Sequence, residues 1–129
     1  MKYPWMIHIV SDNTLKDGMV DAHTHGLDKY DSLELQFVIC CENSAIAYLL
    51  NAVGDMVRNG MQLEDGQLIE GVCYDGAKLK VFKTKDDFGE DIFRIILPDG
   101  QFRFPEDSDE WPYNLQYESP YKKKISRYN

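Results

Sequence analysis

Two histidines and an aspartate recur at every second position in the segment 21–26, which reads DAHTHG. If this segment is a β-strand, its period of two places Asp21, His23 and His25 on the same face of a sheet. Two imidazoles and a carboxylate on one face form a ligand set that could hold Zn²⁺ or Fe²⁺. The sequence therefore allows a small metal-dependent hydrolase, or a small-ligand-binding protein, built on this strand.

The same string is similar to the D-x-H-x-H motif that opens the metal sites of amidohydrolase barrels. Such barrels need about 250 residues and further histidines downstream, whereas this chain has 129 residues and its third histidine, His8, lies upstream. Chain length thus excludes that class. The simpler interpretation is that His23 and His25 sit at a strand end and hydrogen-bond to backbone or carboxylate groups. On that interpretation we expect no metal and no cofactor.

Other catalytic sets are not assembled in the sequence. Cys40 and Cys41 lie in an apolar run, where burial would raise the thiol pKa and so oppose activation. The third cysteine makes an odd number without a CxxC motif, which favours reduced, mostly buried thiols. The acidic run 106–110 lacks the ligand spacing of an EF-hand, and no glycine-rich loop suits a phosphate.

An amphipathic helix is the most regular element that the sequence predicts, over about 44–59. Its apolar positions recur at helical spacing: Ile46, Leu49, Leu50, Val53, Met56 and Val57. Gly60 follows as a stop, because glycine accepts the left-handed conformation that ends many helices. Such a stripe must be covered, and the rest of the chain offers only strands to cover it.

Runs that predict strands lie on both sides of this helix. They are 5–10, 20–25, 33–41, 68–74, 78–83, 92–97 and 102–104. Asp75-Gly76 and Pro98-Asp99-Gly100 predict tight turns, which only antiparallel neighbours permit. We therefore expect an α+β fold, with one mostly antiparallel sheet of five or six strands and the helix on one face. The predicted domain spans 1–120, and a basic tail follows over 121–129.

Two segments resemble the conserved ends of a family of small, mainly bacterial proteins of unknown function. His23-Thr24-His25-Gly26-Leu27, followed by Leu33-Glu34-Leu35, is similar to the family's T-x-G-L … P-E-L opening. The segment 94–105, RIILPDGQFRFP, is similar to its W-P-D … G-R-F-P closing motif. The resemblance spans about 5–113; it implies a fold and a cytoplasmic location and supplies no reaction.

The same two segments suggest a ligand-binding cleft. A polar T-H-G-L strand end and a P-D-G turn both place strict demands on the backbone. If they meet at one end of the sheet, they form a shared cleft whose polar groups are Thr24, His25, Asp99 and Arg103. The alternative is that the glycines and the proline only shape turns.

Net charge limits the classes of partner. The chain has 14 basic and 22 acidic residues, a net of −8, and four of the basic residues lie in the last nine positions. The rest of the chain is therefore even more acidic, and so acidic a domain repels nucleic-acid phosphates and anionic membrane surfaces. No apolar run reaches the length of a membrane span and no secretory signal is recognisable, so we expect a cytoplasmic protein.

The acidic charge, the lack of an assembled catalytic set and a group of aromatic side chains near the C-terminal end supply the preferred hypothesis. Trp111 and Tyr113 lie beside the acidic run 106–110, and such residues make good contact anchors. We therefore favour a non-enzymatic, accessory or immunity-like domain that binds a protein partner with a basic surface. The alternative is that this aromatic segment wraps the sheet and fills the edge of its core. A homo-oligomer formed by pairing of exposed sheet edges is compatible with the same sequence.

Overall fold

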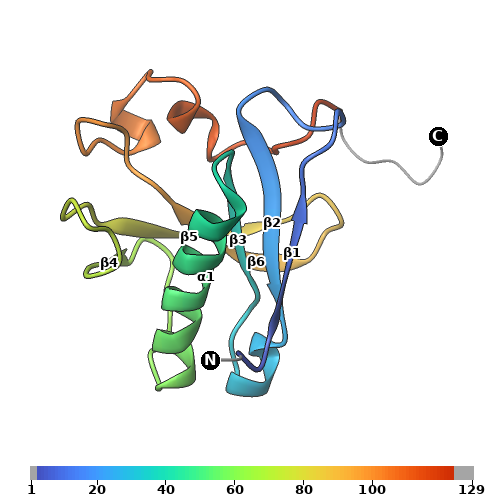
Figure 1. The fold of residues 1–129 in the computed structure, drawn as a ribbon, viewed down its shortest axis with the longest axis vertical. Helices are drawn as coiled ribbons and strands as arrows, with labels where there is room; N and C mark the ends of the chain where they lie inside the picture. Colours follow the sequence, from blue (N-terminus) through green and yellow to red (C-terminus); the bar gives the residue numbers. More distant parts are fainter. Residues whose placement is uncertain (1–2, 124–129) are drawn as a thin grey trace.

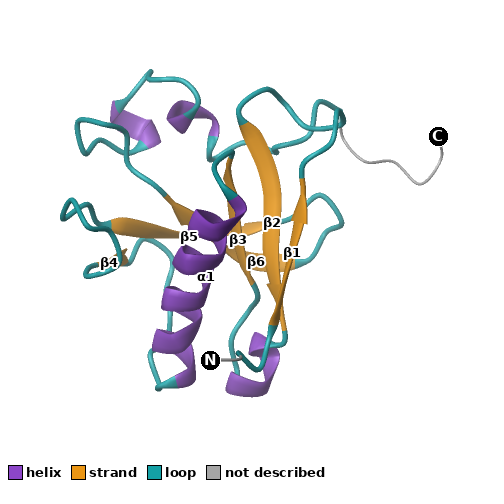
Figure 2. Cartoon of the chain, in the orientation of Figure 1, coloured by secondary structure: helices purple, strands orange, loops and turns teal. Residues whose placement is uncertain are grey.

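A six-stranded sheet with one long helix against it forms the protein in the computed structural model, which describes residues 3–123 (Figures 1 and 2). The strands are β1 (Met6–Val10), β2 (Met19–His25), β3 (Leu35–Ile39), β4 (Leu68–Ile69), β5 (Leu79–Lys85) and β6 (Asp91–Ile96). The helix α1 spans Asn43–Arg58, and short 3₁₀ helices occupy Leu27–Tyr30, Pro105–Asp107 and Tyr113–Leu115. Among the described residues, no helix has the length and apolarity that a membrane crossing requires.

The strand order is β1-β2-β3-β6-β5-β4. Every neighbouring pair is antiparallel except β3 and β6, which run parallel with Leu35 opposite Phe93 and Gln36 opposite Arg94. Two antiparallel ribbons, one from each half of the chain, thus meet at a single parallel seam. The predicted α+β class, with a mostly antiparallel sheet and one helix, is confirmed.

The helix lies against one face of the sheet (Figure 1) and buries its predicted apolar stripe there, apart from the half-buried Met56. Ile46, Leu50 and Val53 are fully buried there, against strand residues such as Phe37. Gly60 adopts the predicted left-handed conformation just after the helix, with φ of 106°. Removing this apolar surface from water contributes roughly 25 cal/mol per Å² buried.

The hairpins differ from the prediction. Strand β4 pairs with β5, but it has only two residues, and the connection from 70 to 78 replaces a tight turn at Asp75-Gly76. The predicted strand 102–104 does not form, and β6 pairs with β5 instead. The reason is local: Asp99 accepts the backbone N–H groups of Gln101 and Arg103, and Phe102 has a φ of 61°, which no ladder accommodates.

The C-terminal segment covers part of the face of the sheet that lies away from α1. Tyr121, the first residue of the predicted basic tail, is buried there and pairs with Leu15 in an isolated bridge. The rest of the predicted basic tail, from residue 124 onward, lies outside the described residues.

Candidate functional site

The hairpin of β1 and β2 brings all three histidines of the chain together. Its antiparallel register places His8 directly opposite His23, and Met6 opposite His25. His23 and His25 are two positions apart, so all three imidazoles project from the same face. This is the second face of the sheet, away from α1, because Ala22 on the opposite side of β2 belongs to the core.

The three imidazoles are close enough to share one ion. One ring nitrogen from each of His8, His23 and His25 lies within 4.8 Å of the other two. The ring centroids of His23 and His25 are 4.6 Å apart, and His8 lies 5.3 Å from His23. His8 and His25 are exposed and His23 is half-buried, so an ion could reach the cluster from solvent.

Asp21, the third predicted metal ligand, has a different position. Its carboxylate is buried, and it accepts hydrogen bonds from Gln36 Nε2 at 2.9 Å and from the Tyr121 hydroxyl at 2.7 Å. His23 Nδ1 lies 3.4 Å from the same carboxylate. The sequence predicted Asp21, His23 and His25 as the ligand set; the structure gathers His8, His23 and His25 instead, with Asp21 behind His23.

Hydrogen bonds to Asp21 keep its carboxylate ionised, and the ionised carboxylate can orient His23. Burial acts to raise the pKa of Asp21, but hydrogen bonds from His23, Gln36 and Tyr121 outweigh it and lower the pKa to about 2. The carboxylate is therefore ionised, and its hydrogen bond raises the pKa of His23. A carboxylate that accepts from Nδ1 leaves Nε2 of the same ring free to bind an ion.

A buried polar network holds Asp21 in place from the far side. Arg94, which is 2% exposed, donates from Nε to Gln36 Oε1 at 2.7 Å. Its Nη1 donates at 2.8 Å to the backbone carbonyls of Gln116 and Glu118. Burial lowers the pKa of Arg94. The network links the histidine face to the C-terminal segment.

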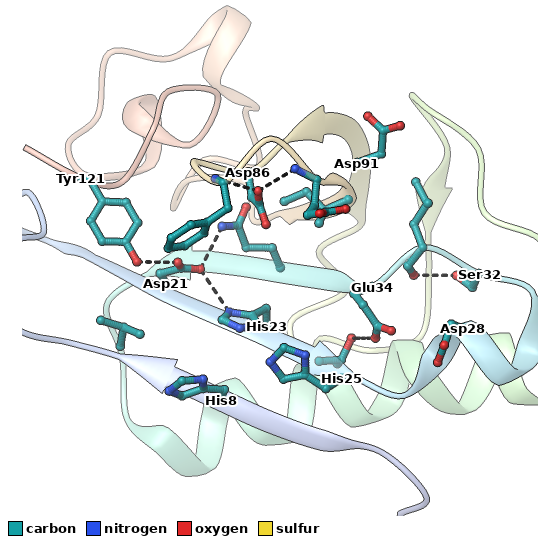
Figure 3. A pocket seen from close by; sticks show the side chains of 17 residues that line it. His8, Asp21, His23, His25, Asp28, Ser32, Glu34, Asp86, Asp91 and Tyr121 are labelled. Atoms are coloured by element: carbon teal, nitrogen blue, oxygen red, sulfur yellow. Dashed lines mark hydrogen bonds and ion pairs between the residues drawn. The ribbon is translucent and has the colours of Figure 1, made fainter. Parts of the chain in front are cut away.

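A cavity of about 600 Å³ opens beside the histidines (Figure 3). One wall comes from the β1–β2 hairpin and the segment between β2 and β3, with Asp28 and Glu34. The opposite wall comes from the β5–β6 connection, with Asp86 and the exposed Phe88. A small molecule in this cavity would lie directly against an ion held by the histidines.

The cleft predicted from Thr24, His25, Asp99 and Arg103 does not form. Thr24 and His25 line the cavity, at the end of β2. Asp99 and Arg103 are absent from its lining and follow β6, whose parallel pairing with β3 carries them to the opposite end of the sheet. They bond to each other instead, with Arg103 Nε donating to Asp99 Oδ2 at 2.9 Å.

The predicted partner-binding residues and the cysteines occupy other surfaces. Trp111 is 59% exposed and Tyr113 is half-buried. Cys40 and Cys41 are exposed, so the expectation of mostly buried thiols is wrong, because β3 ends at Ile39, before both residues. Partial desolvation of the Cys41 thiol, together with the neighbouring Cys40 and Glu42, still raises its pKa, which opposes thiolate chemistry there.

His8 is the member of the histidine cluster that was not predicted from the sequence. It lies in β1, where polar and apolar residues alternate only weakly. The residue of β2 that lies opposite it depends on the length of the connection between the two strands. The only usable signal was the pairing of the first two predicted strands as a hairpin, since the correct register places His8 opposite His23.

No protein-family model, curated protein or solved structure matches the chain. The resemblance to the small bacterial family therefore stays a prediction.

Asp99, at the end of the sheet away from the histidines, gives a prediction about stability in acid. Burial acts to raise the pKa of Asp99, but donors from Ser108, Arg103 and Gln101 outweigh it and hold the pKa below the usual 3.8. This group therefore stabilises the fold above pH 3.8, and the contribution is lost as pH falls through the lower, folded-state pKa. We expect Asp99→Asn to unfold at lower urea concentration at pH 7, and the difference from the parent to shrink below pH 3.8.

Urea titrations at pH 7 and pH 2.5 check this. The control is Asp107→Asn, which removes an exposed acid from the same segment and should leave the midpoint unchanged at both values. A difference that stays constant with pH would contradict the assignment.

Proposed function

We propose that the protein binds a divalent transition-metal ion through His8, His23 and His25 and uses it in hydrolysis of a small molecule held in the adjoining cavity. The observation that carries this proposal is the convergence of every histidine in the chain at the edge of a 600 Å³ cavity.

The ligand set favours Zn²⁺ or a similar ion. Imidazole nitrogens suit zinc, and catalytic zinc sites have three protein ligands with the fourth position left for water or substrate. Such an ion lowers the pKa of its bound water to about 7, which supplies a nucleophile at neutral pH. Asp21 supports this interpretation, because a carboxylate behind a ligating histidine fixes the ring and its tautomer.

Zinc titration of untagged protein against a chromophoric chelator tests the metal site. We expect one Zn²⁺ per chain, and at least about tenfold weaker affinity in His8→Gln, His23→Gln and His25→Gln. His8 and His25 are exposed, so these two variants should fold normally. The matched control is Cys40→Ser with Cys41→Ser, which removes two exposed thiols and should leave the affinity unchanged.

Two results would overturn the metal site: binding well below one ion per chain, or equal affinity in the histidine variants. Hydrolysis is tested separately with a nitrophenyl ester and the zinc-loaded protein. We expect turnover that disappears with a chelator and returns with Zn²⁺. Metal binding without such turnover would restrict the function to metal-dependent binding.

Protein binding is a second candidate, favoured by one observation. Trp111 is 59% exposed on a segment with many acidic residues, which suits contact with a basic partner surface. Capture from cytoplasm at low and high salt, with Trp111→Ala as the comparison, tests it. Loss of a salt-sensitive partner in this variant would support the candidate, and identical capture by both forms would remove it. The cytoplasmic location itself stays a prediction.

A further inference from the structure

We infer that the cavity beside the histidines takes an organic cation: a small molecule that joins a permanent or protonated positive group to an apolar body. This inference names the substrate class of the proposed metal site and therefore rests on the proposed function. The juxtaposition that carries it is a wall of carboxylates with apolar side chains between them, beside the three imidazoles.

The charge of the lining is of one sign. Its carboxylates come from both walls: Asp21, Asp28, Glu34, Asp86, Glu90 and Asp91. Within residues 3–123, no lysine or arginine lines the cavity. Even a bound divalent ion leaves this lining negative. A cavity lined by one charge concentrates ligands of the opposite charge, and low-dielectric walls strengthen the effect.

Four of these carboxylates already accept hydrogen bonds or form ion pairs, but two remain available. Glu34 accepts from the Thr24 hydroxyl and from two backbone N–H groups, and Asp91 pairs with Lys85. In the described part of the chain, no hydrogen bond or ion pair engages the side chains of Asp28 or Glu90. Both line the cavity from different segments, Asp28 from the connection between β2 and β3 and Glu90 from the connection between β5 and β6.

Apolar side chains on the same walls favour a ligand whose remaining part is apolar. Val10, Leu33, Phe88 and Ile92 line the cavity between the acids. Phe88 is 60% exposed, unusual for a phenylalanine, and belongs to the β5–β6 connection. An aromatic face of this kind attracts organic cations through its quadrupole. Phosphates and carboxylates, in contrast, would meet repulsion from the walls before they reached the ion.

Benzyltrimethylammonium and benzoate are suitable probes, because they share a ring and differ in charge, and the quaternary cation cannot bind a metal. Binding is followed by NMR titration of the ¹⁵N-labelled chain, first metal-free and then loaded with Zn²⁺. In the metal-free protein we expect the cation to bind about tenfold more tightly than benzoate, with the preference reduced by added salt.

The variant that tests the walls is Asp28→Asn with Glu90→Gln. We expect it to bind the cation about fivefold more weakly while it still takes up one Zn²⁺ per chain. The control is Asp109→Asn, an exposed acid outside the cavity lining, which should bind the cation as the parent does.

Equal binding of cation and benzoate by the metal-free protein, or unchanged cation affinity in the double variant, would overturn the inference. The metal-free arm separates this outcome from failure of the proposed function. A chain that prefers the cation but takes up no Zn²⁺ would retain the cation site and lose the metal site. A chain that takes up Zn²⁺ but shows no charge preference would do the reverse.

Discussion

Replacing Arg94 with alanine is expected to lower the free energy of unfolding by about 3–5 kcal/mol. The guanidinium is 2% exposed and donates three hydrogen bonds, one to Gln36 and two to backbone carbonyls of the C-terminal segment. Alanine leaves these acceptors buried without donors and opens a cavity between β6 and that segment. Chemical unfolding followed by fluorescence measures the loss.

The control for this variant is Arg58→Ala. Arg58 is 30% exposed and pairs with Asp55 one turn earlier in α1, so its removal should cost less than about 1 kcal/mol. Hydrogen exchange adds a second readout. We expect Arg94→Ala to lose protection at residues 116–121 before the rest of the sheet, because Arg94 is the link between the two. A loss similar to that of Arg58→Ala would contradict the role assigned to this network.

Replacing Gly54 with alanine should destabilise the protein by about 1–3 kcal/mol, although alanine is the better helix former by about 1 kcal/mol. The reason is the ring of Trp5, which lies across this position of α1. A Cβ built on Gly54 would lie 2.7 Å from Cζ2 of that ring. The ring cannot easily move, because it is buried and its Nε1 donates to Asn51 Oδ1 at 2.8 Å.

A double-mutant cycle with Trp5→Phe isolates this contact, because phenylalanine lacks the second ring that carries Cζ2. In the Trp5→Phe background we expect Gly54→Ala to be neutral or stabilising, as for a glycine in an ordinary helix. Thermal unfolding of the four proteins gives the coupling free energy. If alanine destabilises both backgrounds equally, the close approach of Trp5 is not the cause.

Local pattern was sufficient to predict most elements of the fold. Helix α1 follows from the spacing between Ile46 and Val57, and the strands up to β3 follow from their apolar runs. Pairing was harder to predict because it depends on residues far apart in the chain. The P-D-G sequence predicted a hairpin from β6 to 102–104, yet Asp99 draws the backbone into a closed loop and β5 pairs with β6.

The site, like the fold, could be predicted only where it depends on local sequence pattern. The period of two correctly placed Asp21, His23 and His25 on one face of β2. It could not reveal that Asp21 is held by Tyr121, 100 residues away, or that His8 occupies the neighbouring register position. The expected meeting of Thr24 with Asp99 failed for a topological reason, since the parallel pairing of β3 and β6 sends these residues to opposite ends of the sheet.

The parallel seam between β3 and β6 has a consequence during synthesis. All five residues of β3 are buried in the finished protein, yet one edge of this strand has no partner until β6 is made, more than fifty residues later. A nascent or truncated chain that stops before residue 91 therefore presents an unpaired apolar strand to its neighbours. Such edges template aggregation. We therefore expect the ribosome-bound chain to expose this strand edge from the emergence of β3 until that of β6.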